Sequence, residues 1–230
     1  MPVWYDAVAV TFSASGKNRL TRYDLGRFPG TRLFDRVARA VCEAGCLPRK
    51  ELYESWEMAR RVRRRFRGGR VVDVAGGHGL LAHLLLLLDD SSACARVVDP
   101  SRPPSAETLH RRIVEAWPRL AGRVEHADVP LESFPLAGTD LVVSCHACGS
   151  LTDRVIDGAV SASSRVAVLP CCHAVETCDA GHLAGWVGPA LAIDLMRASR
   201  LEQRGYRIWT QTIPASITAK NRLLLAEPRR

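Results

Sequence analysis

Residues 71–79 bring together types that can bind a nucleotide-like cofactor: a β-branched run, the acid Asp73, and three glycines. An almost uninterrupted apolar run follows, from Leu80 to Leu88. This order predicts a buried parallel strand, a tight turn and a helix. Glycine has no Cβ and lets the backbone approach a ligand closely. The N–H groups that begin the helix would point at whatever lies over the turn. The segment is therefore typical of a cofactor cradle.

Two further segments place cysteines beside histidines. One begins Ser144-Cys145-His146-Ala147-Cys148-Gly149, and the other is Leu169-Pro170-Cys171-Cys172-His173. We expect each to end a parallel strand, at the edge of the sheet where ligands bind. His146 and His173 would then face the substrate, where an imidazole could accept a hydroxyl or amine proton. The alternative is that both histidines satisfy backbone groups at the strand ends.

The cysteines and histidines of these segments, together with Cys178 and His182, also allow a metal site, because Cys-x-x-Cys, Cys-Cys-His and Cys-x-x-x-His spacings suit zinc. Structural zinc sites usually lie on short knuckles, however, whereas small thiols at buried strand ends simply pack. No charged partner at a fixed spacing indicates a catalytic thiol. We therefore expect no obligate metal ion, and we assign Cys148 and Cys172 to substrate binding.

Strands and helices that alternate along the chain must position these residues. Strands are predicted at 71–74, 95–99, 123–126, 140–144, 166–169, 206–213 and 222–226, and helices between them at 79–88, 105–121, 152–162 and 189–204. The alternation predicts an α/β fold with a mainly parallel, Rossmann-like sheet. The last two strands have no helix between them and should form an antiparallel hairpin at one end of the sheet.

The positive charge of the chain is concentrated before residue 70. Residues 1–70 contain 16 Lys and Arg against 7 Asp and Glu, and the remaining 160 residues contain 16 against 17. This indicates a basic helical N-terminal segment, residues 1–68, followed by a cofactor-binding domain, residues 69–230. Within the segment, helices are predicted at 33–44 and 50–67.

The helix at 50–67 carries an apolar stripe with acids in its first turns and six arginines between residues 60 and 67. It could be an ordinary surface helix whose charges compensate its dipole. The arginines exceed that need, and phosphate neutralisation would use them. We assign Arg61, Arg64 and Arg65 to RNA binding, with a plain solvated helix surface as the alternative.

Composition narrows the class of protein. The chain has 230 residues, of which 47% are hydrophobic and 24% charged, as suits a globular domain. No apolar run is long enough to span a bilayer, and the first residues lack a secretory pattern. Eight cysteines beside histidines, without an export signal, favour reduced thiols. We expect a cytoplasmic protein that does not bind membranes.

Three acids favour S-adenosylmethionine over a dinucleotide, although the glycine turn alone fits both. Asp73 lies inside the first strand, within reach of a methionine amino group. Asp99 ends the second strand and could accept both ribose hydroxyls, and Asp128 follows the third, near an adenine amino group. The chain here resembles the class I methyltransferases, whose first motif is an acid, a spacer and glycines. The resemblance implies that S-adenosylmethionine is held by Asp73, Ala75, Gly76, Gly77, Gly79, Asp99, Asp128 and Ser144. Ala75 stands where that family more often has glycine.

The two cysteine-histidine segments resemble one branch of that family. It contains the methyltransferase-like 25 proteins, the methyltransferase domain of the glutathione S-transferase C-terminal-domain-containing protein, and the tRNA acceptor-stem 2′-O-methyltransferases. The resemblance covers residues 49–227, includes Lys50 and Glu54 before the cofactor strand, and lacks the zinc-finger region of the tRNA enzymes. It implies a class I seven-stranded fold and methyl transfer, with RNA (tRNA or rRNA) as the preferred acceptor. A protein or small-molecule acceptor, or an RNA-binding scaffold without turnover, remains the alternative.

Overall fold

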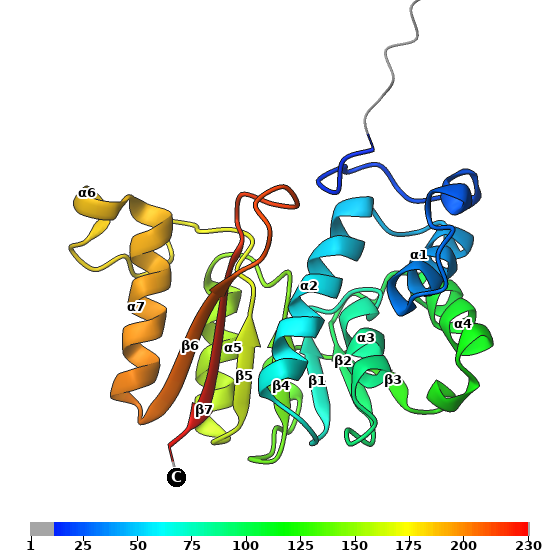
Figure 1. The fold of residues 1–230 in the computed structure, drawn as a ribbon. Helices are drawn as coiled ribbons and strands as arrows, with labels where there is room; N and C mark the ends of the chain where they lie inside the picture. Colours follow the sequence, from blue (N-terminus) through cyan, green and yellow to red (C-terminus); the bar gives the residue numbers. More distant parts are fainter. Residues whose placement is uncertain (1–11, 230) are drawn as a thin grey trace, which may run out of the picture.

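A seven-stranded sheet with helices on both faces organises residues 12–229, the part of the chain that the computed structural model describes (Figure 1). The strands are β1 Val71–Val74, β2 Ala95–Val98, β3 Val124–Ala127, β4 Leu141–Ser144, β5 Arg165–Val168, β6 Tyr206–Thr212 and β7 Arg222–Pro228. β1 and β4 are buried along their whole length, as expected for strands covered on both faces.

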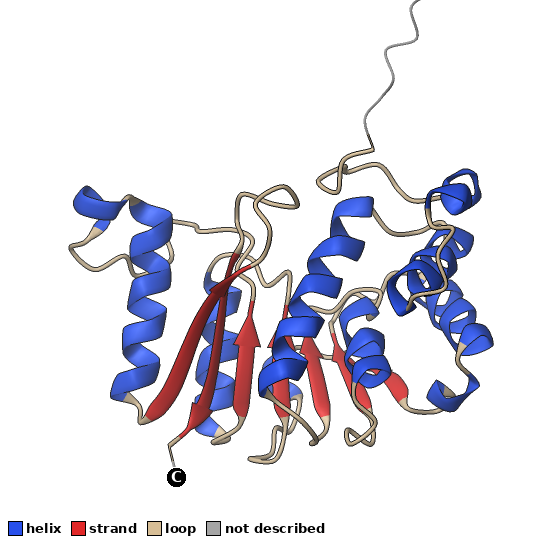
Figure 2. Cartoon of the chain, viewed as in Figure 1, coloured by secondary structure: helices blue, strands red, loops and turns tan. Residues whose placement is uncertain are grey.

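The helices are α1 Leu33–Ala44, α2 Arg49–Arg65, α3 Leu80–Leu88, α4 Ala106–Ala116, α5 Ser150–Ser161, α6 Ala184–Val187 and α7 Pro189–Gln203 (Figure 2). Short 3₁₀ helices lie at Arg22–Arg27, Pro118–Leu120 and Leu131–Ser133. The helix predicted at 105–121 is shorter than expected, because Pro118 cannot continue an α-helix and the chain turns into a 3₁₀ segment there. None of the helices within residues 12–229 is long and apolar enough to cross a membrane.

The sheet has the strand order β3-β2-β1-β4-β5-β7-β6. β1 to β5 pair in parallel, whereas β7 is antiparallel to both β5 and β6. The expected fold class and C-terminal hairpin are therefore confirmed. The strand order reverses between β1 and β4, so the carboxyl ends of these two strands form the topological switch point, where ligands bind in such sheets.

Helix α2 lies over one face of the sheet (Figure 1). It begins near the carboxyl ends of the parallel strands and ends near their amino ends. There Arg65 forms an ion pair of 3.7 Å with Glu227 of β7. Buried side chains of α1 and α2 share one hydrophobic cluster with β1 and α3. The domain boundary proposed at residue 68 thus lies within a continuous core.

Candidate functional site

A narrow crevice opens at the switch point between β1 and β4. It is lined by Glu51, Ser55, Asp73, Ala75, Gly76, Leu80, Leu81, Cys145 and His146. Its volume is about 10 Å³, room for about one water molecule.

Asp73 lies at the bottom of this crevice, 1% exposed. Its Oδ2 accepts a hydrogen bond of 3.1 Å from the Ala82 amide, in the first turn of α3. Its Oδ1 is buried and has no partner within residues 12–229. Burial raises the Asp73 pKa to about 7, and the nearby charges of Asp99 and Glu51 act in the same direction. An orphaned buried carboxylate oxygen suits a cationic ligand group such as an ammonium.

The glycine turn combines left-handed backbone with close packing. Ala75, Gly77 and Gly79 have φ of 53°, 50° and 76°, a region that favours glycine. A Cβ on Gly76 would lie 2.8 Å from Asp73 and Val97, whereas a Cβ on Gly77 would meet no atom of the described chain. The turn therefore leaves open space beside Gly77, and this space and the Asp73 oxygen fit a bound cofactor.

Two histidines, which sequence reasoning did not single out, support this turn. The buried His83 donates from Nδ1 to the Gly79 carbonyl at 2.7 Å, and its Nε2 lies 3.0 Å from His110 Nδ1. Burial lowers the His83 pKa to about 4. His83 is thus a neutral member of the scaffold.

The acids after β2 and β3 lie around the same turn. Asp99 Oδ2 accepts from the Gly77 amide at 3.0 Å and its Oδ1 from the Ser101 amide at 2.9 Å. Asp128 is exposed directly after β3. Asp99 therefore holds the turn itself, and a ribose hydroxyl would have to share its oxygens with these amides.

Ser144, assigned to cofactor binding from the sequence, has its hydroxyl engaged within the sheet. Its Oγ donates to the Val74 carbonyl at 2.7 Å and accepts from the Ala147 amide at 3.2 Å. Ser144 thus ties the carboxyl ends of β1 and β4 together.

The first turns of α2 contribute polar groups to the crevice. From the sequence, the acids among them are expected mainly to compensate the helix dipole. Lys50 Nζ lies 2.6 Å from Glu54 Oε1, and Glu54 is 3% exposed. Its Oε2 is buried without a partner in the described chain. Burial raises the Glu51 pKa to about 7, and the charge of Glu54 adds to this. These crevice residues could have been found in the sequence, because Glu51 and Ser55 are four residues apart and therefore lie on one face of the helix.

The two histidines predicted as catalytic lie in different environments. His146 lines the crevice, and its Nε2 is buried without a hydrogen-bond partner among residues 12–229. Burial lowers its pKa, although Glu54 opposes this. His173 instead bonds through Nε2 to Asp194 Oδ1 at 2.9 Å. The geometry therefore brings His146, but not His173, to the crevice beside Asp73.

His173 belongs to a partly buried ionic network between α5, α7 and the two cysteine-containing loops. Asp194 also pairs with Arg197 at 3.3 Å and with Arg222 at 2.6 Å. Burial opposes ionisation of Asp194, but hydrogen bonds from His173 and Arg222 keep its pKa below the ordinary value. Arg197, fully buried, also donates to both oxygens of Asp153 and to the Gly149 carbonyl. This network fixes the loops after β4 and β5.

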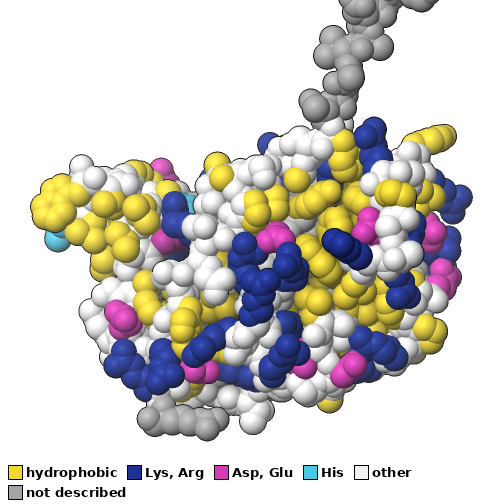
Figure 3. Space-filling view, in the orientation of Figure 1, with side chains coloured by type: hydrophobic (Ala, Val, Ile, Leu, Met, Phe, Trp, Pro, Cys, Tyr) yellow, Lys and Arg dark blue, Asp and Glu magenta, His cyan; other side chains and the backbone are white. Residues whose placement is uncertain are grey.

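The arginines of α2 have partners of their own. Arg61 pairs with Glu57 one turn earlier, and Arg65 stacks over Trp209 at 3.5 Å from the ring centroid. Arg63 is 2% exposed and forms an ion pair with Asp89 at 3.1 Å, so it is not part of a solvated face. Arg64 is exposed. Basic side chains are prominent over the lower face in Figure 3.

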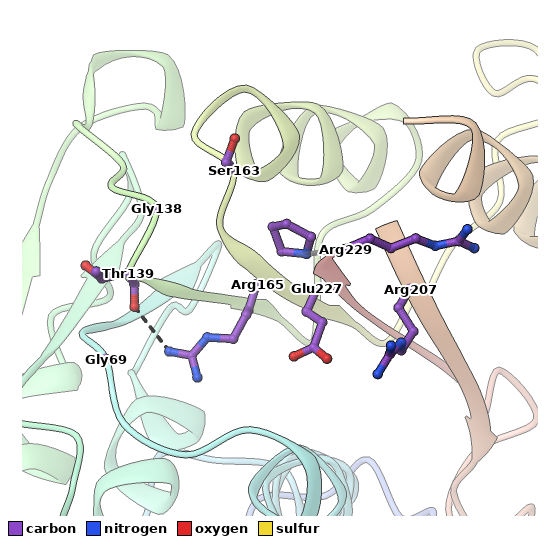
Figure 4. Close-up of a pocket in the computed structure, with 9 residues that line it drawn as sticks. Gly69, Gly138, Thr139, Ser163, Arg165, Arg207, Glu227 and Arg229 are labelled. Carbon is purple, nitrogen blue, oxygen red and sulfur yellow. Dashed lines mark hydrogen bonds between the residues drawn. The ribbon is translucent and has the colours of Figure 1, made fainter. Parts of the chain in front are cut away.

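A cavity of about 1060 Å³ lies at the amino edge of the sheet (Figure 4). Arg165, Arg207, Glu227 and Arg229 line it, and Arg165 Nη2 donates to the Thr139 carbonyl at 3.1 Å. It is far larger than the crevice at the switch point. It lies at the wrong end of the strands for cofactor binding in this kind of sheet, so the crevice remains the candidate site.

Comparison with known proteins agrees with the observed fold. A family model described as a methyltransferase domain matches residues 50–177. No curated protein sequence matches the chain. Among solved structures, the S-adenosylmethionine-dependent methyltransferase SibL is similar, with a TM-score of 0.52 and 21% identity over 90% of this chain and 65% of that chain.

Two further solved structures show weaker similarity. An O-methyltransferase family protein from Burkholderia thailandensis has a TM-score of 0.48 and 16% identity over 90% of this chain and 69% of that chain. The ribosomal protein L11 methylase from Lactobacillus delbrueckii subsp. bulgaricus has a TM-score of 0.49 and 13% identity over 79% of each chain. Of the three, only SibL has a TM-score above 0.5, and at 21% identity that likeness supports the fold alone. The family match spans more than half of the chain, which therefore belongs to this methyltransferase-domain family and is an S-adenosylmethionine-dependent methyltransferase.

Proposed function

We propose that the acceptor of the methyl group is RNA, tRNA or rRNA, and that the enzyme belongs to the branch of the methyltransferase-like 25 proteins and the tRNA acceptor-stem 2′-O-methyltransferases. The cysteine-histidine segments after β4 and β5 support the branch. We also propose that the enzyme works in the cytoplasm, where its free thiols would stay reduced.

The observation that carries an RNA acceptor is the set of basic side chains outside the crevice, whose own lining contains the acids Glu51 and Asp73. Burial lowers the pKa values of His78 and His126, and the charges of Arg19 and Arg102 lower them further. A hydrogen bond with Cys148 lowers the Cys172 pKa, and Lys220 and Lys50 act in the same direction. Basic side chains close enough to act on these groups would attract a polyanion to this edge.

The length of α2 sets how far an acceptor must extend to contact both of its ends. Its 17 residues separate the crevice end from the arginine end by about 25 Å, at about 1.5 Å per residue. Arg61, Arg64 and Arg65 would therefore bind phosphates remote from the methylated nucleotide. A structured RNA can reach both ends of α2, whereas a metabolite cannot.

In the proposed mechanism, Asp73 Oδ1 would accept a hydrogen bond from the amino group of the cofactor, and Asp99 and Asp128 would bind its ribose and adenine. S-adenosylmethionine supplies an electrophilic methyl group when bound. His146 is held neutral by burial, so its Nε2 can accept a proton from the attacking group of the RNA. Cys148 and Cys172, at the same edge, would border the bound nucleotide.

The proposal is tested by offering methyl-labelled S-adenosylmethionine with fractionated tRNA, rRNA, protein and metabolite extracts. We expect label in an RNA fraction, and none with Asp73→Ala. Label confined to protein or metabolites would refute the RNA acceptor. Binding of an RNA without any transfer to any fraction would instead favour the scaffold alternative.

The arginine end of α2 is tested separately by its salt dependence. Phosphate contacts to a single strand give a log–log slope of about −0.7 per contact. Changing Arg61, Arg64 and Arg65 together to glutamine should flatten the slope and leave the affinity for S-adenosylmethionine unchanged. An unchanged slope would make this an ordinary surface helix. Arg111→Gln, on α4, is the matched control.

A further inference from the structure

Three thiols meet at the carboxyl edge of the sheet, outside the crevice. Cys148 precedes α5, and Cys171 and Cys172 follow β5. Their Sγ atoms all lie within 4.8 Å of one another, and those of Cys148 and Cys171 are 3.0 Å apart. Cys148 and Cys172 are exposed and Cys171 is half-buried. The sequence argument against a metal relied on thiols that pack in the interior, and it does not apply to these three.

The backbone that carries the thiols is fixed by hydrogen bonds between the two loops and by residues of α7. The Gly149 amide donates to the Cys172 carbonyl at 3.3 Å, which joins the two loops directly. Arg197 donates to the Gly149 carbonyl at 3.0 Å, and His173 is held by Asp194. A site whose supporting groups are already in place loses little conformational freedom when a ligand binds.

The sulfur separations suit a small thiophilic cation. With Zn–S bonds of about 2.3 Å in a tetrahedron, neighbouring sulfurs lie about 3.8 Å apart. This value falls between the observed contact of 3.0 Å and the upper bound of 4.8 Å, so side-chain rotation alone can produce it.

We propose that Cys148, Cys171 and Cys172 bind one Zn²⁺ ion through three thiolates, with the fourth tetrahedral position left to solvent. Each ligand exchanges its S–H proton for the metal, so up to three protons are released for each ion bound. A disulfide could join only two of the three sulfurs and would leave the third without a role. The ion would fasten the loop after β4 to the loop after β5, and this proposal does not depend on the identity of the methyl acceptor.

The test uses the full-length protein, stripped of metal by a chelator and kept reduced without oxygen. Titration with Zn²⁺ should show one equivalent bound, and Co²⁺ should give the intense near-ultraviolet absorption of thiolate coordination. Cys148→Ser and Cys172→Ser, both at exposed positions, should each weaken Zn²⁺ binding at least 100-fold. Cys94→Ser, a half-buried cysteine outside the cluster, is the control and should bind as the unchanged protein does.

Two results would overturn the proposal. One is reduced protein that binds no Zn²⁺, including the case in which mass spectrometry finds a Cys148–Cys171 disulfide after air exposure. The other is Zn²⁺ binding that survives the Cys148→Ser, Cys172→Ser double variant. Circular dichroism of each variant confirms that the fold is intact before titration.

Discussion

His83 and His110 hydrogen bond to each other beneath the glycine turn, with 3.0 Å between His83 Nε2 and His110 Nδ1. The Gly79 carbonyl can only accept, so His83 carries its proton on Nδ1 and must accept at Nε2. Protonation of His83 would turn its Nε2 into a donor, and His110 would have to change tautomer before its Nδ1 could accept. The turn that borders the crevice is therefore built for a neutral imidazole.

This arrangement predicts a loss of stability in acid. The His83 pKa is lowered to about 4 in the folded protein, against about 6.5 in an unfolded chain. Its contribution to stability is fully present above about pH 6.5 and is lost as the pH falls toward 4, with an upper limit on the order of 3 kcal/mol. Urea unfolding between pH 7 and 4.5 should show a smaller pH dependence in His83→Gln than in the unchanged protein.

The comparison must be made between variants because acids act in the opposite direction. Asp73 and Glu51 have pKa values raised to about 7, so their contribution to stability is present at low pH and is lost as the pH rises through 7. Equal pH dependence with and without His83 would show that this histidine is charged, or solvated, in the folded state.

Asp73 predicts a pH-dependent affinity for the cofactor. Only the ionised carboxylate pairs strongly with an ammonium group, and a pKa near 7 means that ionisation rises about tenfold between pH 6 and 8. The affinity for S-adenosylmethionine, measured by calorimetry, should rise by a similar factor. Asp73→Asn should bind weakly, with a flatter profile, and Glu51→Gln should retain the Asp73 dependence. A pH-independent affinity in the unchanged protein would contradict this role.

The glycine turn predicts opposite effects at neighbouring positions. Gly76→Ala places a Cβ 2.8 Å from Asp73 and Val97, both buried, and should destabilise the protein by about 1–3 kcal/mol and weaken cofactor binding. Ala75→Gly relieves a left-handed φ of 53° and should be neutral or stabilising by up to about 1 kcal/mol. Chemical denaturation and calorimetry on both variants measure this contrast, and a stable Gly76→Ala protein with normal affinity would refute it.

Substitutions of the two histidines in the cysteine-histidine segments should have different effects, one on the rate of transfer and the other on stability. Because His146 Nε2 is orphaned in the crevice, His146→Ala should lower the rate of transfer by about 10²- to 10⁴-fold without unfolding the protein. His173→Ala removes a partner of the partly buried Asp194 and should lower the melting temperature more than His146→Ala does. Full turnover in His146→Ala would remove it as the base.

The sequence predicted most of the fold because strand and helix periods are local. β1 and α1 begin and end at the predicted residues, and the absence of a helix before residue 222 predicted the hairpin correctly. The glycine turn was also recognisable, since residue types there follow from backbone conformation. Asp73 in particular was predicted to face the ligand, and its buried orphan oxygen is consistent with that prediction.

Features that depend on distant partners could not be predicted in this way. His83 lies in a run of leucines. No neighbouring residue in the sequence distinguishes a histidine that hydrogen bonds to the turn from one that only packs in the core. Arg63 was read as part of a basic face, but its ion pair with Asp89 and its hydrogen bond to Ser92 join residues far apart in the chain. Exposure of the thiols of Cys148 and Cys172 likewise follows from how two loops meet.

The helical repeat of α2 fixes how the side chains at its two ends are oriented relative to each other. Each inserted residue would rotate everything beyond it by about 100° and advance it by about 1.5 Å. An insertion near Trp56 would therefore turn either Glu51 and Ser55 away from the crevice or Arg63 away from Asp89. To keep the contacts at both of its ends, α2 can therefore change its length only by whole turns.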